Sequence, residues 1–244
     1  IETPGTLIVD GGRFTNNTGT PCIGTLPCEL AILGNLQFIR GIFNGSGVLS
    51  NTGTMDLSVG GTFSNAITNA GGTIKVGSGV VFQQIFTNNG GTLLVQPGNT
   101  TFSGGYTQNS GLTNMFGGTM IGNINLAGGD LKGSGTINGN LVVDGTLSVG
   151  FSPGALNIFG NLTLNPTSIT NIELGGTAPG TGYDVINVSG LATLGGTLNV
   201  SLYGGYIPAV GSRYSFLNFG SSSGSFASTN LLSGISLNSF ASYL

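Results

Sequence analysis

Side chains that could perform acid–base or nucleophilic chemistry are few in this chain. Its 244 residues include eight acidic residues, five basic residues and no histidine. Without histidine, neither a Ser-His-Asp nor a Cys-His catalytic arrangement can form. A glycoside hydrolase needs two carboxyl groups roughly 5 to 10 Å apart, and Asp130 and Asp144 are the pair best spaced for it. We interpret both as solvated acids near turns and predict a protein that is not an enzyme; the alternative is a polysaccharide-active enzyme using this pair.

Three features look like parts of ligand sites but lack essential residues. Gly128-Gly129-Asp130 is a fragment of the calcium-binding nonapeptide, and eight acids in the whole chain cannot supply a ladder of carboxylates. The segment GSGTING at 133–139 has neither the lysine nor the helix that follows a phosphate-binding loop. Two cysteines without a histidine leave half of a zinc site missing. We therefore predict no metal and no other cofactor.

The two cysteines, Cys22 and Cys28, lie in the segment PCIGTLPC, bounded by Pro21 and Pro27. A disulfide bond can close so short a loop, and it would indicate an oxidising compartment. The alternative is a pair of buried thiols. We favour the disulfide and expect residues 20–33 to form a loop held by it.

Positive charge is too dispersed for nucleic-acid binding. The five basic residues are Arg13, Arg40, Lys75, Lys132 and Arg213. A nucleic-acid interface needs clustered basic side chains, so we predict no nucleic-acid partner. No run of apolar residues approaches the length of a transmembrane helix. The chain begins at Ile1 without a visible signal peptide, from which we expect a processed protein or a fragment.

An internal sequence repeat predicts the secondary-structure elements that position these side chains. Three consecutive stretches, Gly53 to Gly71, Gly72 to Gly90 and Gly91 to Gly111, follow one template of 19 to 21 residues. Within each stretch apolar and polar residues alternate, and a phenylalanine recurs at nearly constant spacing. A period near 20 is too short for helical hairpins and fits one coil of a β-solenoid. The sequence therefore predicts an all-β parallel β-helix with about 19–21 residues per coil.

Alignment of the coils predicts which side chains stack on one another. A phenylalanine column inside the solenoid would bury apolar area and disfavour a slip in register. Its expected members are Phe43, Phe63, Phe82 and Phe102. Asp56 and Lys75 share one outward position of the template, so we expect an ion pair between neighbouring coils. Asparagines at the turns are expected to form ladders of side-chain amides.

A second aligned set consists of Thr54, Thr73 and Thr92. A flat threonine array would indicate ice binding, but the neighbouring positions vary between coils. We interpret these threonines as β-forming residues beside glycine turns.

We expect the solenoid to form a single domain over residues 1–244, because no linker separates its parts. Residues 203–244 depart from the repeat and hold eight of the 14 Phe and six Tyr residues of the chain. Terminal coils of solenoids are atypical, because an exposed end offers an open strand edge. We therefore expect an aromatic-rich C-terminal cap or assembly region. The candidates for assembly contacts are Tyr203, Tyr206, Tyr214, Phe216, Phe219 and Phe226.

The stretch from Gly128 to Gly176 resembles the passenger-associated transport repeat of bacterial autotransporter-type surface proteins. The match rests on GTINGN at 135–140, SPG at 152–154 and IELGG at 172–176, and the segment YDVINVSG from Tyr183 is typical of the sequence after that repeat. The departure is VGF at 149–151, where such proteins often have a Pro-Gly-Asn turn. The resemblance implies a right-handed β-helix that is exported and displayed at, or shed from, the cell surface. It brings no catalytic residues.

Together these observations predict a non-enzymatic, extracellular structural protein of bacterial origin. We expect a β-helical rod on the cell surface that self-associates end to end into a fibre or filament, because one exposed end coil can stack on the other. The alternative is a monomeric adhesin that binds glycans or host or abiotic surfaces through its flank. Phage-fibre and ice-binding roles are further alternatives.

Overall fold

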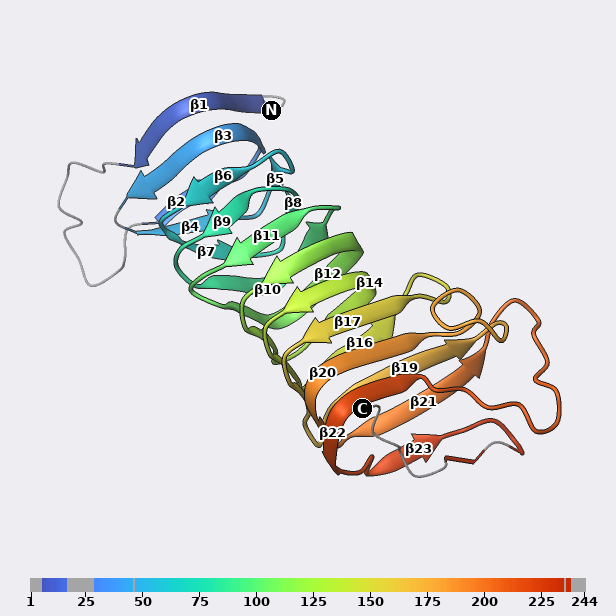
Figure 1. Cartoon of the computed structure of the whole chain (residues 1–244). Helices are drawn as coiled ribbons and strands as arrows, with labels where there is room; N and C mark the ends of the chain where they lie inside the picture. Colours follow the sequence, from blue (N-terminus) through green and yellow to red (C-terminus); the bar gives the residue numbers. More distant parts are fainter. Residues whose placement is uncertain (1–5, 17–28, 46, 235, 238–244) are drawn as a thin grey trace. The chain divides into compact units, whose positions relative to one another are not determined.

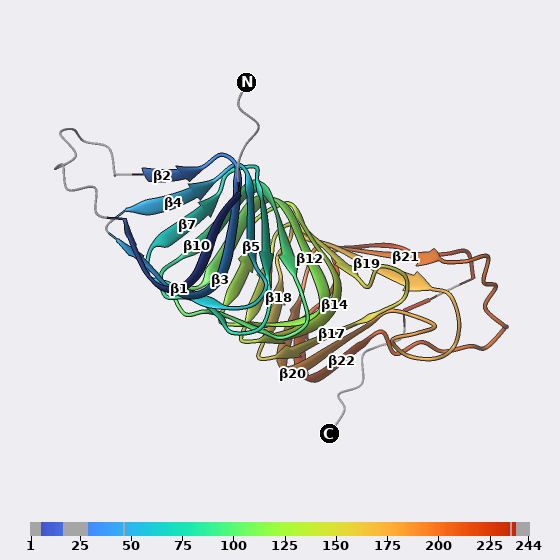
Figure 2. The ribbon, with the colours of Figure 1, turned by 90° about the horizontal axis from the view of Figure 1, so that it is seen from above.

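The computed structural model describes residues 6–16, 29–45, 47–234 and 236–237. In these ranges the protein is all-β, and parallel strands stack as a β-solenoid (Figures 1 and 2). The predicted fold class is therefore confirmed. The chain divides into two compact units, Ile1–Asn123 and Ile124–Leu244, and each is described by itself. The predicted Cys22–Cys28 disulfide lies outside the described residues.

Each coil of the first unit has three strand segments, and the longer strands continue around a corner to supply more than one of them. Its strands are β1 (Thr6–Asn16), β2 (Glu29–Ile32), β3 (Asn35–Gly45), β4 (Val48–Asn51), β5 (Thr54–Leu57), β6 (Gly61–Phe63), β7 (Ala66–Asn69), β8 (Thr73–Val76), β9 (Val80–Phe82), β10 (Phe86–Val95), β11 (Asn99–Phe102) and β12 (Tyr106–Ile121). One coil consists of β5, β6 and β7, and the next begins at β8. Every strand therefore lies beside its counterpart in the next coil, as β4, β7 and β10 do in Figure 2.

The register of the first unit follows the template found in the sequence. Met55 pairs with Ile74, and Ile74 pairs with Leu93, all of them buried. Because side chains alternate between the two faces of a strand, these apolar positions point inward while the intervening residues point outward. The threonine set Thr54, Thr73 and Thr92 is aligned in the same way.

Paired glycines at the corners allow the coils to approach closely. Gly90 has φ of +88°, a conformation that residues with a side chain rarely adopt. A Cβ atom at the next residue, Gly91, would collide with the Asn69 side chain of the preceding coil. Both glycines of this corner are therefore required, one by its backbone conformation and the other by its neighbour.

The predicted phenylalanine stack is confirmed. Phe43, Phe63, Phe82 and Phe102 are at most 2% exposed. Their successive ring centroids lie 5.9, 5.4 and 5.2 Å apart. A second set of rings packs against this stack, with Phe38 at 5.0 Å from Phe63 and Phe86 at 4.9 Å from Phe82. Such distances are those of favourable aromatic pairs.

The prediction of a loop over residues 20–33 is wrong for its last part. Glu29–Ile32 forms β2 and pairs in register with β4. The reason is the alternation of Leu30 and Ile32, which places them beside Leu49 and Asn51. The sequence signal for this strand was present but only four residues long.

The second unit repeats the three-strand plan, with register partners 16 to 17 residues apart in its first coil and about 30 apart in its last coils. Its strands are β13 (Ile124–Leu126), β14 (Asp130–Asn138), β15 (Leu141–Val143), β16 (Thr146–Val149), β17 (Ala155–Phe159), β18 (Leu162–Leu164), β19 (Ile169–Leu174), β20 (Val185–Leu194), β21 (Thr197–Leu202), β22 (Leu217–Gly224) and β23 (Ser228–Asn230). The stacked core residues Ile137, Ile158, Val188 and Phe219 are separated by 21, 30 and 31 positions.

Two loops account for the longer coils. Residues 175–184 connect β19 to β20, and residues 203–216 connect β21 to β22. The predicted C-terminal cap therefore has two parts. Residues 203–216 form a loop, and β22 and β23 then form one more solenoid coil. Figure 1 shows β22 beside β20, and β21 beside β19.

Candidate functional site

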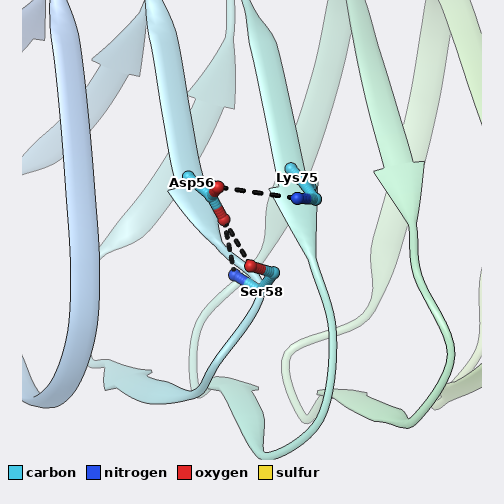
Figure 3. A network of polar contacts seen from close by, with 3 residues as sticks. All are labelled: Asp56, Ser58 and Lys75. Atoms are coloured by element: carbon cyan, nitrogen blue, oxygen red, sulfur yellow. Dashed lines mark hydrogen bonds and ion pairs between the residues drawn. The ribbon is translucent and has the colours of Figure 1, made fainter.

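The predicted ion pair between Asp56 and Lys75 is present on the outer surface of the first unit (Figure 3). The two residues are register partners in β5 and β8, and Lys75 Nζ lies 3.6 Å from Asp56 Oδ2. The other carboxylate oxygen accepts hydrogen bonds from Ser58 N at 3.0 Å and Ser58 Oγ at 2.6 Å. Partial burial by itself would raise the pKa of Asp56, but the Ser58 hydrogen bonds and the Lys75 charge together hold it below 3.8. The pair confirms the register and contains no reactive group.

Replacing Lys75 with methionine is expected to change the free energy of unfolding by less than about 1 kcal/mol, because both partners are about one-third exposed and exposed ion pairs contribute little. Urea unfolding of both proteins at equal ionic strength measures this difference. A loss of several kcal/mol would show that Lys75 has a larger structural role than the ion pair alone.

Of the two acids considered for glycoside hydrolysis, Asp144 is held by side-chain hydrogen bonds. Asp144 lies at the turn between β15 and β16 and accepts hydrogen bonds from Asn165 Nδ2 at 2.9 Å and Thr167 Oγ1 at 3.2 Å. Asp130 begins β14, where its register partner is Thr146. Across the described ranges, no cluster of three or more His, Cys, Asp or Glu residues could hold a metal ion.

A ladder of side-chain amides, the inner ladder, runs through the core of the first unit. Asn51 donates to Asn69 at 2.9 Å, Asn69 donates to Asn88 at 3.1 Å, and Asn88 donates to Gln108 at 3.3 Å. All four side chains are fully buried. The ladder also closes the corners, since Asn88 Nδ2 donates to the Gly91 carbonyl at 3.0 Å. The expected asparagine ladder is thus confirmed, in a buried position.

Two further ladders, the outer ladders, lie on outward faces of the second unit. In the first, Asn218 donates to Asn187 at 2.8 Å and Asn187 donates to Asn157 at 2.9 Å. The second outer ladder links Asn230, Asn199 and Asn171 at 2.7 and 2.9 Å. The sequence analysis missed these sets, because their members are about 30 residues apart and do not share the 20-residue period.

Asp184 is a buried acid that the sequence analysis did not single out. Its side chain is 0% exposed, and its two oxygens accept hydrogen bonds from Gly154 N and Glu173 N, both at 2.7 Å. Burial raises the pKa of Asp184 to about 6, although the two N–H groups favour the anion and lower it. Asp184 therefore joins the SPG turn at 152–154 to the end of β19.

The six assembly candidates occupy three kinds of position. Phe216 and Phe219 are buried, so they are core residues of the last coils and not part of an exposed assembly surface. Tyr206 and Tyr214 share a hydrogen bond of 2.7 Å between their hydroxyls. Tyr203 is 43% exposed and Phe226 is half-buried. The prediction failed for the two buried phenylalanines because a high aromatic content does not distinguish a core from a surface.

The 203–216 loop also borders a cleft of the second unit. This cleft of about 1010 Å³ is lined by apolar side chains of β19 and β21, including Leu174 and Leu202, by the loop residues Ile207 and Val210, and by Leu231. Ile207 and Val210 are largely exposed. The second unit therefore presents accessible apolar surface near its last strands.

The described part contains no helix with the length and apolar character needed to cross a bilayer. No protein-family model, curated protein or solved structure matches this chain.

Proposed function

We propose that this protein is an extracellular structural β-solenoid, displayed on the bacterial cell surface, which assembles end to end into a fibre. The observation that carries the proposal is the open edge of the last coil. Register pairs join β22 to β20 and β23 to β21, and among the described strands none pairs with their other edges. An open strand edge is a template for pairing with another chain.

The outer ladders support pairing at this edge. Asn218 and Asn230 each donate the side-chain N–H to the preceding coil, which leaves their Oδ1 atoms as the acceptors at the end of each ladder. A further coil that continued the stack would present its donors to these acceptors. At the opposite terminus β1 pairs with β3 on one side, and the described chain has no strand on the other. If the last coil of one copy contacts the first coil of the next, each added copy leaves an end free for another, and an open filament results.

The composition of the last coil indicates that the contact between two copies would rely on backbone hydrogen bonds. Ser222 and Thr229 stand where the preceding coil has the core residues Ala192 and Leu198, and both polar residues are exposed. A polar terminal coil keeps the free protein in solution. The chain also carries a net charge of only −3, so charge repulsion between copies is small.

Negative-stain electron microscopy and sedimentation velocity test the proposal. The purified protein is expected to form filaments at neutral pH, and the double variant Ser223→Lys, Asn230→Lys is expected to abolish them, because lysines on an edge strand block pairing. Thr101→Lys on the flank of the first unit is the matched control and should leave filaments intact. A monodisperse wild-type monomer over a range of concentrations would overturn the fibre assignment. Surface labelling of intact source cells tests the location separately.

A further inference from the structure

A shallow groove runs along the outer face of the second unit, beside the first outer ladder. It has a volume of about 250 Å³. One wall is Phe159, whose side chain is 60% exposed, and the other wall is formed by the amides of Asn187 and Asn218. The floor between the walls carries Ser189 and Gly220, which have little or no side chain to fill it.

The register explains why the groove exists. Asn157, Asn187 and Asn218 are aligned register partners, and Phe159 lies two residues after Asn157, so its side chain points to the same outward face. Ser189 follows Val188 and Gly220 follows Phe219, the stacked partners of Ile158 in the next two coils, and the pairing of β20 with β22 shifts by one residue between Val188 and Leu191. A large exposed aromatic ring is thus followed by a small residue in each of the next two coils, beside the first outer ladder.

The groove is chemically neutral and amphipathic. No charged residue lines it, which disfavours anionic or cationic ligands. The Phe159 ring offers an apolar face, and each carboxamide has both donor and acceptor capacity. A pyranose ring presents the complementary pair of surfaces: an apolar C–H face that stacks on an aromatic ring, and hydroxyl groups that donate and accept hydrogen bonds.

We propose that this groove binds a neutral, pyranose-based glycan. The sugar stacks on Phe159 and hydrogen-bonds to the Asn187 and Asn218 amides. The groove is smaller than enclosed ligand pockets of roughly 300 to 1,000 Å³, and it is open to solvent, so it takes one or two sugar units. Successive amides recur at the strand spacing of about 4.8 Å, which offers contacts at regular intervals. The inference does not depend on fibre formation.

Affinity electrophoresis in native gels tests the site, with dextran, hydroxyethylcellulose or yeast mannan in the gel as the neutral polysaccharide probe. At least one probe is expected to retard the wild-type protein. Phe159→Ala should weaken that binding about tenfold, the effect of losing one aromatic stacking contact. Ser189→Gln, which fills the floor with a polar side chain, should weaken it to a similar extent. Both sites are exposed, so the variants should keep the wild-type melting temperature.

Phe116→Ala is the matched control, because Phe116 is an exposed phenylalanine of the first unit and its loss should leave retardation unchanged. The assembly variant Ser223→Lys, Asn230→Lys should still bind, because neither residue lines the groove; this separates the glycan site from the fibre. The proposal is overturned if no probe retards the wild type, or if Phe159→Ala and Ser189→Gln bind as the wild type does. Equal weakening by Phe116→Ala would also overturn it.

Discussion

Replacing Phe82 with alanine is expected to lower the free energy of unfolding by about 3 to 5 kcal/mol, the range for removing a buried aromatic side chain. Phe82 is 0% exposed. Its ring lies 5.4 Å from that of Phe63, 4.9 Å from that of Phe86 and 5.2 Å from that of Phe102. The corners that close each coil limit how far the neighbouring coils can collapse, so the removed ring leaves a cavity.

Urea unfolding and amide hydrogen exchange measure this effect. Because each coil contacts only its neighbours, the largest loss of exchange protection should occur in β6 and β11, which flank Phe82 in β9. Val81→Ala is the control at the adjacent outward position, where the loss should stay near 1 kcal/mol or below. Equal losses for the two variants would contradict the assignment of Phe82 to the core stack.

The second large effect concerns Asp184 and the pH dependence of stability. Burial raises the pKa of Asp184 from 3.8 to about 6, against the lowering effect of the Gly154 and Glu173 N–H groups. Between these two pH values the folded state holds a proton that the unfolded state releases. The stability contribution of this group is therefore fully present below pH 4 and is lost as pH rises through 6. A pKa shift of this size corresponds to a change of about 3 kcal/mol in the free energy of unfolding.

Asp184→Asn removes this titration and one of the two acceptors. The asparagine oxygen can accept from only one of the two N–H groups, and the amide nitrogen then faces the other donor. This unsatisfied N–H group is expected to lower the free energy of unfolding by about 1 to 3 kcal/mol. Urea unfolding at pH 4, 5, 6 and 7 should give a stability that falls with pH in the wild type and falls less in the variant. Identical slopes in the two proteins would show that Asp184 does not cause the dependence.

From β3 onward the first unit was predictable to the level of single side-chain contacts, because its coils there have nearly equal length. A constant period aligns Phe63 with Phe82, and it aligns Asp56 with Lys75 without any further information. Each of these alignments is present in the structure. Two-residue alternation then determines which residues face the core.

The second unit resisted prediction because two loops change the length of its coils. With the 175–184 loop inserted, Asn157 and Asn187 no longer share a short period, and their pairing becomes apparent only in three dimensions. Asp184 looks like an ordinary polar residue in the segment YDVINV. Its burial depends on the SPG turn of the preceding coil, which local sequence cannot bring into contact with it.

The close match of coil lengths in the first unit also determines how the protein can change in size during evolution. Loss of the 19 residues Gly72 to Gly90 would remove one whole coil, place Phe63 against Phe102 and keep inward residues facing inward. Loss of a single residue within a strand would instead turn the rest of that strand inside out. Variants that differ by entire coils therefore keep the register of every strand, as do loops inserted between strands, and an array of this kind can lengthen or shorten by recombination between its own repeats.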